Sequence, residues 1–542
     1  MKSMGASNSS TNEDVSFGID CDSFQKDMKG DDFSSNNSST VSISSSSSFS
    51  SEDNDGTKSS PASIHQYNIV DGKTKDLWWI HGHGYDLMNF VKDHPGGTEA
   101  ILLGKGRDCT ALVESYHAFS GERVWKVLKK HRFVEEEREE IDEFATVSAT
   151  TVASTEERSG RVPDFFYEVL KKRVTKVLHS KGIDPVKDRG ASRIRIVYYL
   201  AVLGSWLYAG YLHCSGSILG SFAFAVTGWL MGALGHDAGH FAASRWAAVN
   251  EYGVWAMSFI CNPVMWQQQH TYGHHSFTNE FDRDPDLHHF DLLLRVHKNL
   301  KHEAKFRYQS SVFYVLFAYL FVVFGTCLWI PWGVLSEGTL YGIVDWHDKD
   351  RPTKFYGMLF HLISYIGIVL FVPIFVHESF AKAALASYVH VATLGVTFAL
   401  FSQINHLNEP SLEADMDTRE QKQNQVQGQR NAKRDPRLAR SWGAAQVETA
   451  NNFASQSLLW HVLSNGLNHQ IEHHLFPGLN HGHLHHIAPV VKETCEEFGV
   501  LYKSYDTWTD LMSATLEWFD KLSVVDDDVT TDAPKIKTIK IS

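Results

Sequence analysis

Three clusters of histidines have the spacing that metal binding requires. The clusters read His236-Asp-Ala-Gly-His240, His270-Thr-Tyr-Gly-His274-His275 and Gln470-Ile-Glu-His473-His474. Residues four apart on a helix lie on one face, about 6 Å apart, and imidazole nitrogen binds iron well. Each cluster can therefore present two or three ligands from one helical face. Together the three clusters predict a metal site.

A second kind of histidine pair lies earlier in the chain. His94 begins the tetrad His94-Pro-Gly-Gly97, and His117 follows it in Glu-Ser-Tyr-His117. Two histidines on separate short helices can bind the opposite faces of a haem and saturate its iron, so that the haem carries electrons rather than substrate. Pro95 and the two glycines allow a tight turn close to the porphyrin edge. The alternative is a turn histidine and an unrelated surface histidine.

Composition limits the possible classes of protein. The chain has 542 residues, too many for one compact core, and a net charge of -13. This acidity, without a basic aromatic groove, argues against a nucleic-acid partner. A hydrophobic fraction of 43% with 33 Phe and 15 Trp indicates membrane content. The six cysteines form no CxxC pair, so we expect neither a disulfide framework nor a zinc knuckle.

The chain divides into five segments by composition. The first 63 residues are rich in Ser and Asn and contain no apolar stretch, so we expect a disordered leader without a secretory signal. The predicted segments are this leader at 1–63, a small soluble domain at 64–140, a flexible linker at 141–162, a membrane domain at 163–520 and a C-terminal tail at 521–542.

Two apolar hairpins are expected to cross the membrane. Segments 196–213 and 217–235 form the first, and 356–376 and 381–402 form the second; each is about long enough for a hydrocarbon core of ~30 Å. Basic residues precede the first hairpin and follow the second. Because such residues favour the cytosolic side, both termini and all three clusters are predicted to face the cytosol.

Parity decides how the remaining apolar stretches must lie. If residues 311–333 also crossed the bilayer, the third cluster would emerge opposite the first two, and a shared metal site would be impossible. We therefore interpret 311–333, which contains Pro331 and Gly333, as interfacial or re-entrant. Residues 245–266 are interpreted as interfacial as well. The prediction is four transmembrane helices with a cytosolic cap.

The small domain resembles cytochrome b5 from Trp78 to about Phe133. The resemblance rests on Asp86-Leu-x-x-Phe90, on the His94-Pro-Gly-Gly97 tetrad, and on Asp108-x-Thr110 before His117. It implies a small α+β domain that holds haem b between His94 and His117.

Residues 190–505 resemble the membrane fatty-acid desaturase superfamily, whose three histidine boxes match the three clusters. The flanks agree, with Trp266-Gln-Gln-Gln-His270 before the second box and Leu475-Phe-Pro477 after the third. Gln470 in place of the first histidine of box three, joined to an N-terminal cytochrome b5 domain, resembles the front-end subgroup. The resemblance implies a mainly α fold and two non-haem irons. The implied site consists of His236, His240, His270, His274, His275, His473 and His474, with Gln470 beside them and His406 as an additional ligand.

This resemblance implies a front-end acyl desaturase, which inserts a cis double bond between an existing one and the carboxyl end of a polyunsaturated acyl chain. O2 is the co-substrate, and position 5 is favoured over 6, 8 or 4. The expected partners are membrane lipid, an acyl lipid or acyl-CoA substrate, and cytochrome b5 reductase with NADH, at the endoplasmic reticulum. The alternatives are a sphingolipid long-chain base desaturase, an acyl hydroxylase and, more remotely, a non-catalytic haem-binding membrane protein.

Further polar residues lie in or near the boxes. Asp237 and Glu472 could accept the second N–H of a ligating imidazole, or could point elsewhere. We interpret the remaining histidine-rich stretches as surface: His288, His289, His481, His483, His485 and His486.

Overall fold

The computed structural model describes residues 76–133, 163–346, 351–412, 438 and 441–524. The predicted leader at 1–63 and linker at 141–162 lie outside these residues, as does the tail from residue 525. Helix α23 (Trp508–Ser523) continues past the boundary predicted at residue 520.

The small domain combines one β-hairpin with short helices. Strands β1 (Trp78–Ile80) and β2 (His83–Tyr85) pair antiparallel, and both turn residues, His81 and Gly82, have positive φ, as the tightest hairpin turns require. The helices are η2 (Met88–Asp93), α2 (Thr98–Leu102), α3 (Thr110–Tyr116) and α4 (Gly121–His131). Trp78, Ile80 and Tyr85 are almost fully buried between hairpin and helices. The expected α+β domain is confirmed.

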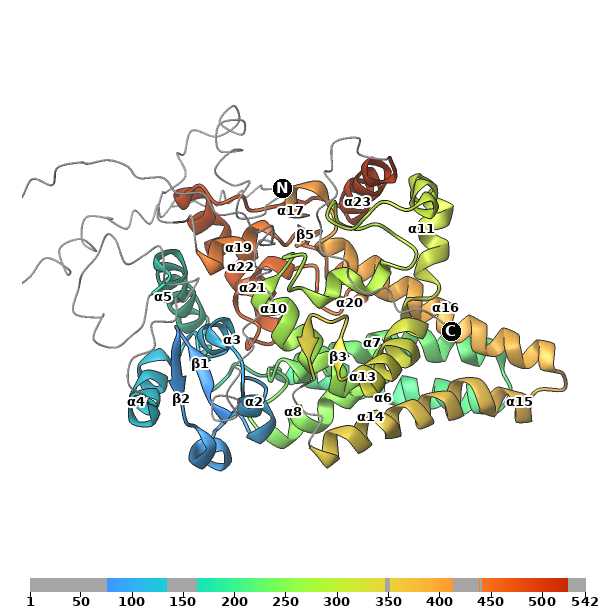
Figure 1. The fold of residues 1–542 in the computed structure, drawn as a ribbon, viewed down its shortest axis with the longest axis horizontal. Coiled ribbons are helices and arrows are strands. Elements are labelled where there is room, and N and C mark those ends of the chain that lie inside the picture. Colours follow the sequence, from blue (N-terminus) through green and yellow to red (C-terminus); the bar gives the residue numbers. More distant parts are fainter. Residues whose placement is uncertain (1–75, 134–162, 347–350, 413–437, 439–440, 525–542) are drawn as a thin grey trace, which may run out of the picture. The chain divides into compact units, whose positions relative to one another are not determined.

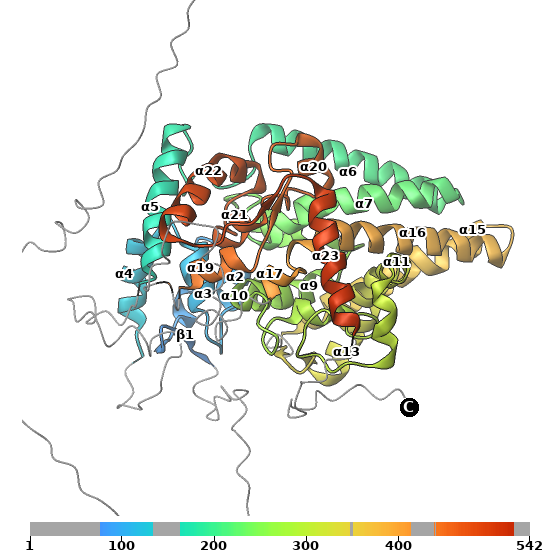
Figure 2. The same ribbon diagram turned by 90° about the horizontal axis from the view of Figure 1, so that it is seen from above.

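Two long helical hairpins extend side by side in the membrane domain (Figures 1 and 2). The first consists of α6 (Arg193–Cys214) and α7 (Ile218–Gly239); the second consists of α14 (Pro352–Tyr365), η10 (Ile366–Phe371), α15 (Val372–Val376) and α16 (Phe380–Phe401). Ser192, Ser217 and Ser379 cap the helices that follow them, each accepting a backbone N–H three residues on.

Among the described residues, four helices are long and apolar enough to cross a membrane: Ile218–Gly239, Val312–Glu337, Pro352–Val376 and Phe380–Asn405. The predicted number is confirmed, but the set differs, since 312–337 is included and 196–213 is not. Four tyrosines and Trp206 lower the hydropathy of 196–213. Its helix, α6, nevertheless exposes apolar side chains as a lipid-facing helix does, with Leu200 63% and Tyr211 66% exposed.

The stretch after residue 311 runs across the long helices in Figure 1 rather than along them. It consists of α11 (Val312–Tyr319), α12 (Val322–Phe324), η8 (Gly325–Trp329) and α13 (Ile330–Glu337). It crosses α16 closely at Gly395, where a Cβ would collide with the carbonyl oxygen of Tyr319. The interfacial or re-entrant role predicted for 311–333 remains a prediction, consistent with this direction.

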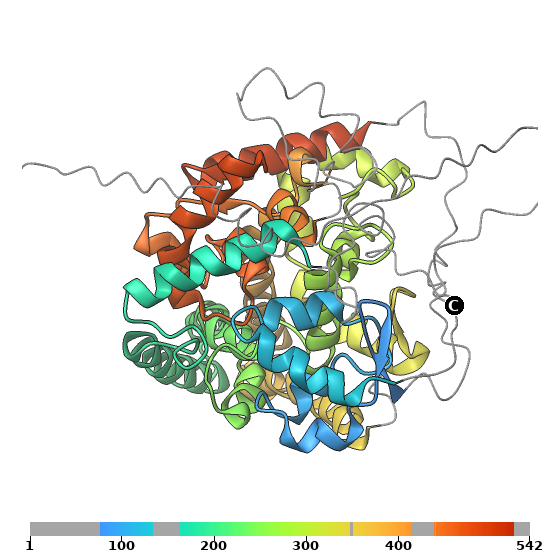
Figure 3. The same cartoon turned by 90° about the vertical axis from the view of Figure 1, so that its left-hand side faces the viewer.

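The remaining helices and strands cap the long hairpins at the end nearest the small domain. Figure 3 shows α5 (Phe165–Ser180) beside the C-terminal helices, and buried apolar residues such as Leu170, Ile471 and Ile487 join these elements. The other helices are α8 (Ala247–Gly253), η4 (Val254–Met257), α9 (Pro263–Trp266), η5 (Gln267–His274), α10 (His275–Phe277), η6 (Pro285–Phe290), η7 (Ala304–Ser310), η11 (Gln403–Asn405), α17 (Glu409–Leu412), α19 (Trp442–Glu448), α20 (Leu458–Leu463), α21 (Gln470–Leu475) and α22 (His481–Phe498). Two-residue strands pair as β3 (Thr339–Leu340) with β4 (Val344–Asp345) and β5 (Asn452–Phe453) with β6 (Ser504–Tyr505).

Candidate metal centre

The three predicted clusters come together at the inner end of the long hairpins. Their side chains form two neighbouring groups of nitrogen atoms. In the first group, one ring nitrogen each of His236, His240, His270 and His473 lies within 4.8 Å of the others; in the second, the same holds for His274, His406 and His474. His406, the additional ligand implied by the resemblance, therefore lies with the cluster histidines.

The second cluster reaches this arrangement through a π-helix, which the sequence did not predict. Gln267–His274 forms η5, and its wider turn brings residues five apart over one another. The Nε2 atoms of His270 and His275 are consequently 3.3 Å apart, and the Nε2 of His275 is 3.2 Å from that of His473. His275 thus extends the first group. The α-helical spacing argument holds for His236 and His240 at the end of α7.

Gln470 contacts two members of the second group. Its side-chain nitrogen lies 3.0 Å from Nε2 of His406 and 3.1 Å from Nε2 of His474. It therefore stands beside these histidines, as the resemblance implied.

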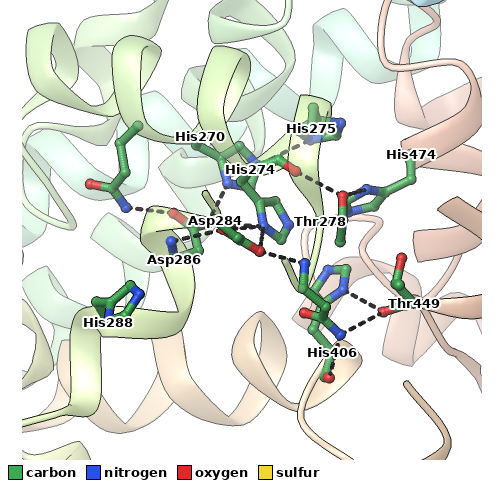
Figure 4. A network of polar contacts seen from close by, with 12 residues as sticks. His270, His274, His275, Thr278, Asp284, Asp286, His288, His406, Thr449 and His474 are labelled. Carbon is green, nitrogen blue, oxygen red and sulfur yellow. Dashed lines mark hydrogen bonds and ion pairs between the residues drawn. The ribbon is translucent and has the colours of Figure 1, made fainter. Parts of the chain in front are cut away.

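The outward nitrogens of most of these rings are held by oxygen atoms (Figure 4). His270 Nδ1 lies 2.8 Å from Asp286, and His274 Nδ1 lies 2.9 Å from Asp284. Similarly, the Nδ1 of His406 is 3.0 Å from the Thr449 carbonyl oxygen and the Nδ1 of His474 is 2.8 Å from Gln446 Oε1. Such outer partners fix the tautomer and direct Nε2 towards a metal.

The chemistry and spacing of the site fit metal ions. Two ligands about 2.1 Å from one metal stand roughly 3.0–3.4 Å apart at ordinary coordination angles, which matches the Nε2 separations around His275. Within the described residues, the buried Nε2 of His240 has no hydrogen-bond partner. Burial lowers the pKa of His275, His473 and His474 well below the usual value, so these rings are neutral, as metal ligands must be.

Asp286 and Asp284 are largely buried carboxylates beside the second cluster. Burial opposes the ionised form of Asp286, but His274 and His270 outweigh burial and hold the pKa of the Asp286 carboxyl below its usual range. Asp284 similarly outweighs burial at His274, whose pKa is raised. Negative charge therefore faces the outer side of the histidines, where it favours a cation at their inner side.

The two candidate haem ligands face one another in the small domain. The ring centroids of His94 and His117 are 6.0 Å apart, close to the ~6 Å expected when two imidazoles bind one metal from opposite sides at about 2 Å each. Their Nδ1 atoms lie 3.1 Å from the Gly97 carbonyl oxygen and 3.0 Å from the Val113 carbonyl oxygen, which leaves Nε2 for iron. Burial lowers the pKa of His117 to about 4. The pair fits haem ligation.

A small hollow of about 40 Å³ adjoins the first group of histidines. His236, His270 and Asp286 line it together with apolar side chains such as Trp229, Ile260, Phe398 and Leu467. Its mainly apolar lining suits part of a hydrocarbon chain, since ligand sites are lined mostly by apolar side chains with few polar groups.

The carboxylates inside the boxes have other partners. Asp237 bonds His481, Tyr199 and Arg195, and Glu472 bonds Asn452 and Tyr502 at 2.8 Å each. The partners of the cluster histidines come instead from outside the boxes, from Asp284, Asp286 and Gln446. The Asp284-Pro-Asp286 stretch, so soon after the second box, was the sequence signal that could have revealed the first two.

The surface interpretation of the other histidines is wrong at several positions. His481, His483 and His288 are 1%, 6% and 5% exposed. His481 stacks on His473 with 4.5 Å between ring centroids, because Asp237 draws its Nδ1 into the interior. His288 is held by Asp291, 2.6 Å away, and the side chain of His289 is 2% exposed. His485 alone of these six is exposed.

Comparison with known proteins agrees with both parts of the chain. Residues 193–506 match the family model described as "Fatty acid desaturase" and residues 60–134 match "Cytochrome b5-like Heme/Steroid binding domain". The chain is similar to "Acyl-lipid (8-3)-desaturase" of Physcomitrium patens (30% identity over 80% of this chain and 86% of the relative). It is also similar to "Acyl-lipid omega-13 desaturase" of Chlamydomonas reinhardtii (27%, 83% and 91%) and "Delta(5) fatty acid desaturase A" of Dictyostelium discoideum (25%, 82% and 90%). No solved structure was found to match.

Proposed function

The chain belongs to the fatty acid desaturase family, and from that premise we propose that it is a front-end desaturase whose fused haem domain is its electron carrier. Family membership makes it an oxidoreductase of fatty acyl chains, and its apolar helices make it an integral membrane protein. The reaction removes two hydrogens from adjacent methylenes to give a cis alkene. With two electrons and two protons from outside, O2 is reduced to two waters.

One observation carries the proposal: the nitrogen atoms of nine residues converge into two adjoining groups. Seven cluster histidines, Gln470 and His406 form these groups together with outer oxygen partners. The ligands available are neutral imidazoles, which suits a site near lipid because buried charge there is expensive. We propose that the first group and His275 hold one non-haem iron and that the second group, with Gln470, holds another.

The metals would supply chemistry that side chains lack. Two irons with O2 supply an oxidant strong enough to break an unactivated C–H bond, and haem b between His94 and His117 supplies one-electron transfer. The chain's own residues orient these groups: Asp284, Asp286 and Gln446 fix the imidazole rings.

The acyl chain would lie in the hollow next to His236 and His270, which brings its methylenes to the first group. Trp229, Phe398 and Leu467 present apolar surface to the hydrocarbon and exclude water. We propose a polyunsaturated acyl lipid as the substrate, in line with the names of the relatives, with acyl-CoA as the alternative carrier. Position 5 is proposed first, as in the name of the Dictyostelium relative.

The remaining partners follow from this chemistry. Cytochrome b5 reductase with NADH would reduce the haem domain, and the endoplasmic reticulum is the proposed membrane. Both termini and all metal sites would face the cytosol, where the reductant is available.

A feeding assay tests the function. The full chain is expressed in a host supplied with single polyunsaturated acids, and lipids are analysed by gas chromatography with double-bond localisation. The expected product has one new cis double bond between the first existing one and the carboxyl end, at carbon 5. The His270→Ala variant should give none, and His94→Ala should lose both product and haem absorption while still inserting into the membrane.

The same analysis separates the alternatives. A desaturated long-chain base or a hydroxylated acyl chain would replace the proposal with one of the rival activities. Full activity of His94→Ala without an added carrier would remove the fused haem from the mechanism. Purified active protein without non-haem iron would contradict the metal assignment.

A further inference from the structure

One tyrosine of the haem domain reaches into the candidate metal centre. Tyr116 is the last residue of α3 and directly precedes His117. Its hydroxyl oxygen lies 2.5 Å from the Nδ1 of His240, and the two rings are nearly parallel, with an interplanar angle of 15° and centroids 6.2 Å apart. A haem ligand and a candidate iron ligand are therefore joined by one peptide unit, one side chain and one hydrogen bond.

The contact occupies the position that outer partners occupy elsewhere in the centre. The Nδ1 atoms of His270, His274 and His474 bond side chains of the membrane domain itself. At His240 the corresponding partner comes from the haem domain. The other nitrogen of His240, Nε2, is buried among the clusters without a hydrogen-bond partner among the described residues, and the rings of His275 and His473 lie 4.4 and 4.7 Å away. His240 thus presents Nε2 inwards and Nδ1 to Tyr116.

We propose that Tyr116 is a positioning residue of the metal centre, so that docking of the haem domain supplies the outer hydrogen-bond partner of His240 and couples the two domains. The inference rests on the proposed function in taking His240 as an iron ligand. With Nε2 directed to iron, Nδ1 carries the proton and donates a hydrogen bond to the phenol oxygen.

Other contacts hold the haem domain in the orientation that this hydrogen bond needs. Tyr272 donates from its hydroxyl to the carbonyl oxygen of Asp108 at 3.0 Å, and the rings of Phe119 and Phe476 stack 5.4 Å apart. Lys171 bonds Glu114 at 3.3 Å. The interface combines polar and apolar contacts on several sides of Tyr116, which restricts how the domain can rotate about it.

The close fit extends to the haem-side turn. Gly97, the last residue of the tetrad that begins at His94, has a φ of +94°, and a Cβ there would lie 2.7 Å from the Cβ of Ala247 on α8. A side chain at this position would push the haem domain away from the membrane domain. The glycine therefore serves the docked arrangement as well as the turn itself.

Iron affinity gives a readout that is independent of turnover. The full-length chain, reconstituted with haem and iron, is titrated with an Fe²⁺ chelator, and the haem spectrum checks that the small domain is folded. Loss of an outer partner typically weakens metal binding about 10–100-fold. Tyr116→Phe, which keeps the ring and removes the hydroxyl, should therefore release iron to at least about tenfold less chelator, with an unchanged haem spectrum.

Tyr272→Phe is the matched control. It removes one hydroxyl that crosses the same interface but contacts no candidate ligand through that hydroxyl, and should keep wild-type iron affinity. Wild-type affinity in Tyr116→Phe, or equal losses in both variants, would overturn the inference while leaving the proposed function intact. A wild-type chain that retains no non-haem iron would instead overturn the proposed function. In Co²⁺-loaded protein, the visible ligand-field band should shift in Tyr116→Phe alone; an unshifted band would also contradict the inference.

Discussion

The rings of His275 and His474 lie one on the other, with centroids 4.3 Å apart and an interplanar angle of 12°. His275 belongs with the first group of nitrogens through His270 and His473, whereas His474 belongs to the second. The stacked pair therefore connects the two groups, with one ring belonging to each. Each group also has histidines that contact members of the same group but none of the other group.

This division predicts that single substitutions remove metal selectively. His406→Ala should lose about half of the non-haem iron, because His406 contributes to the second group alone. His236→Ala should lose the other half, and the double variant nearly all. Iron analysis per haem on purified protein measures this. Complete loss from His406→Ala alone would mean that the two groups do not bind metal independently.

Replacing Asp284 should weaken metal binding by the second group, although Asp284 is not itself a candidate ligand. Asp284 accepts from His274 Nδ1 and also from the backbone N–H groups of Asn279 and Asp286. Asp284→Asn should reduce iron affinity about 10–100-fold, the usual effect of losing an outer carboxylate, as measured by chelator competition. Asp291→Asn is the matched control, since Asp291 bonds His288 at 2.6 Å outside both groups. An equal loss of iron affinity in Asp291→Asn would contradict this prediction, because it would show that loss of any His–Asp pair weakens iron binding.

Docking of the haem domain should depend on Glu99. This residue bonds Arg351 and lies 2.5 Å from Lys354. Burial disfavours its ionised form, but Lys354 and Arg351 outweigh burial, and the pKa of Glu99 is lowered. A lowered carboxylate pKa means that the contribution is present above the ordinary glutamate pKa and is lost as pH falls through the folded value.

Glu99→Gln should therefore increase hydrogen exchange in α2 and α8 at neutral pH, with a smaller difference at high salt because exposed parts of the pair are screened. Exchange followed by mass spectrometry on the full chain measures both effects. Glu122→Gln, at an exposed position in the first turn of α4, is the control. Unchanged exchange in Glu99→Gln would contradict a docking role.

Gly232, which has no side chain, leaves space in the hollow for the acyl chain. It lines the hollow one helical turn before His236, and a Cβ there would lie 2.7 Å from Cδ1 of Ile260. Because that atom ends a flexible side chain, Gly232→Ala should fold and narrow the hollow. Product analysis with acids of increasing length should show a selective loss of the longest and most unsaturated substrates. Uniform loss across all acids would point to a folding defect instead.

How far the sequence predicts this molecule depends on the range of each interaction. The His94 tetrad and the three boxes are local patterns, so their ligands could be named before their geometry was known. The π-helix at Gln267–His274 carries no such local signal, because its widened turn depends on packing around it. The Tyr116–His240 hydrogen bond joins residues 124 apart in two domains, and no pattern in either domain indicates it. Asp284 and Asp286 lie between these cases, near the second box but after a loop.

The misread histidine, His481, gives the last prediction. Its Nδ1 bonds Asp237, which also bonds Arg195 and Tyr199, so His481 belongs to a buried polar network between α6, α7 and α22. His481→Ala should leave Asp237 with fewer partners and lower the free energy of unfolding by roughly 1–3 kcal/mol, the usual cost of an unsatisfied buried polar group. Thermal unfolding in detergent, compared with His485→Ala at the exposed position nearby, measures this. If both variants unfold at the wild-type temperature, the network does not contribute to stability.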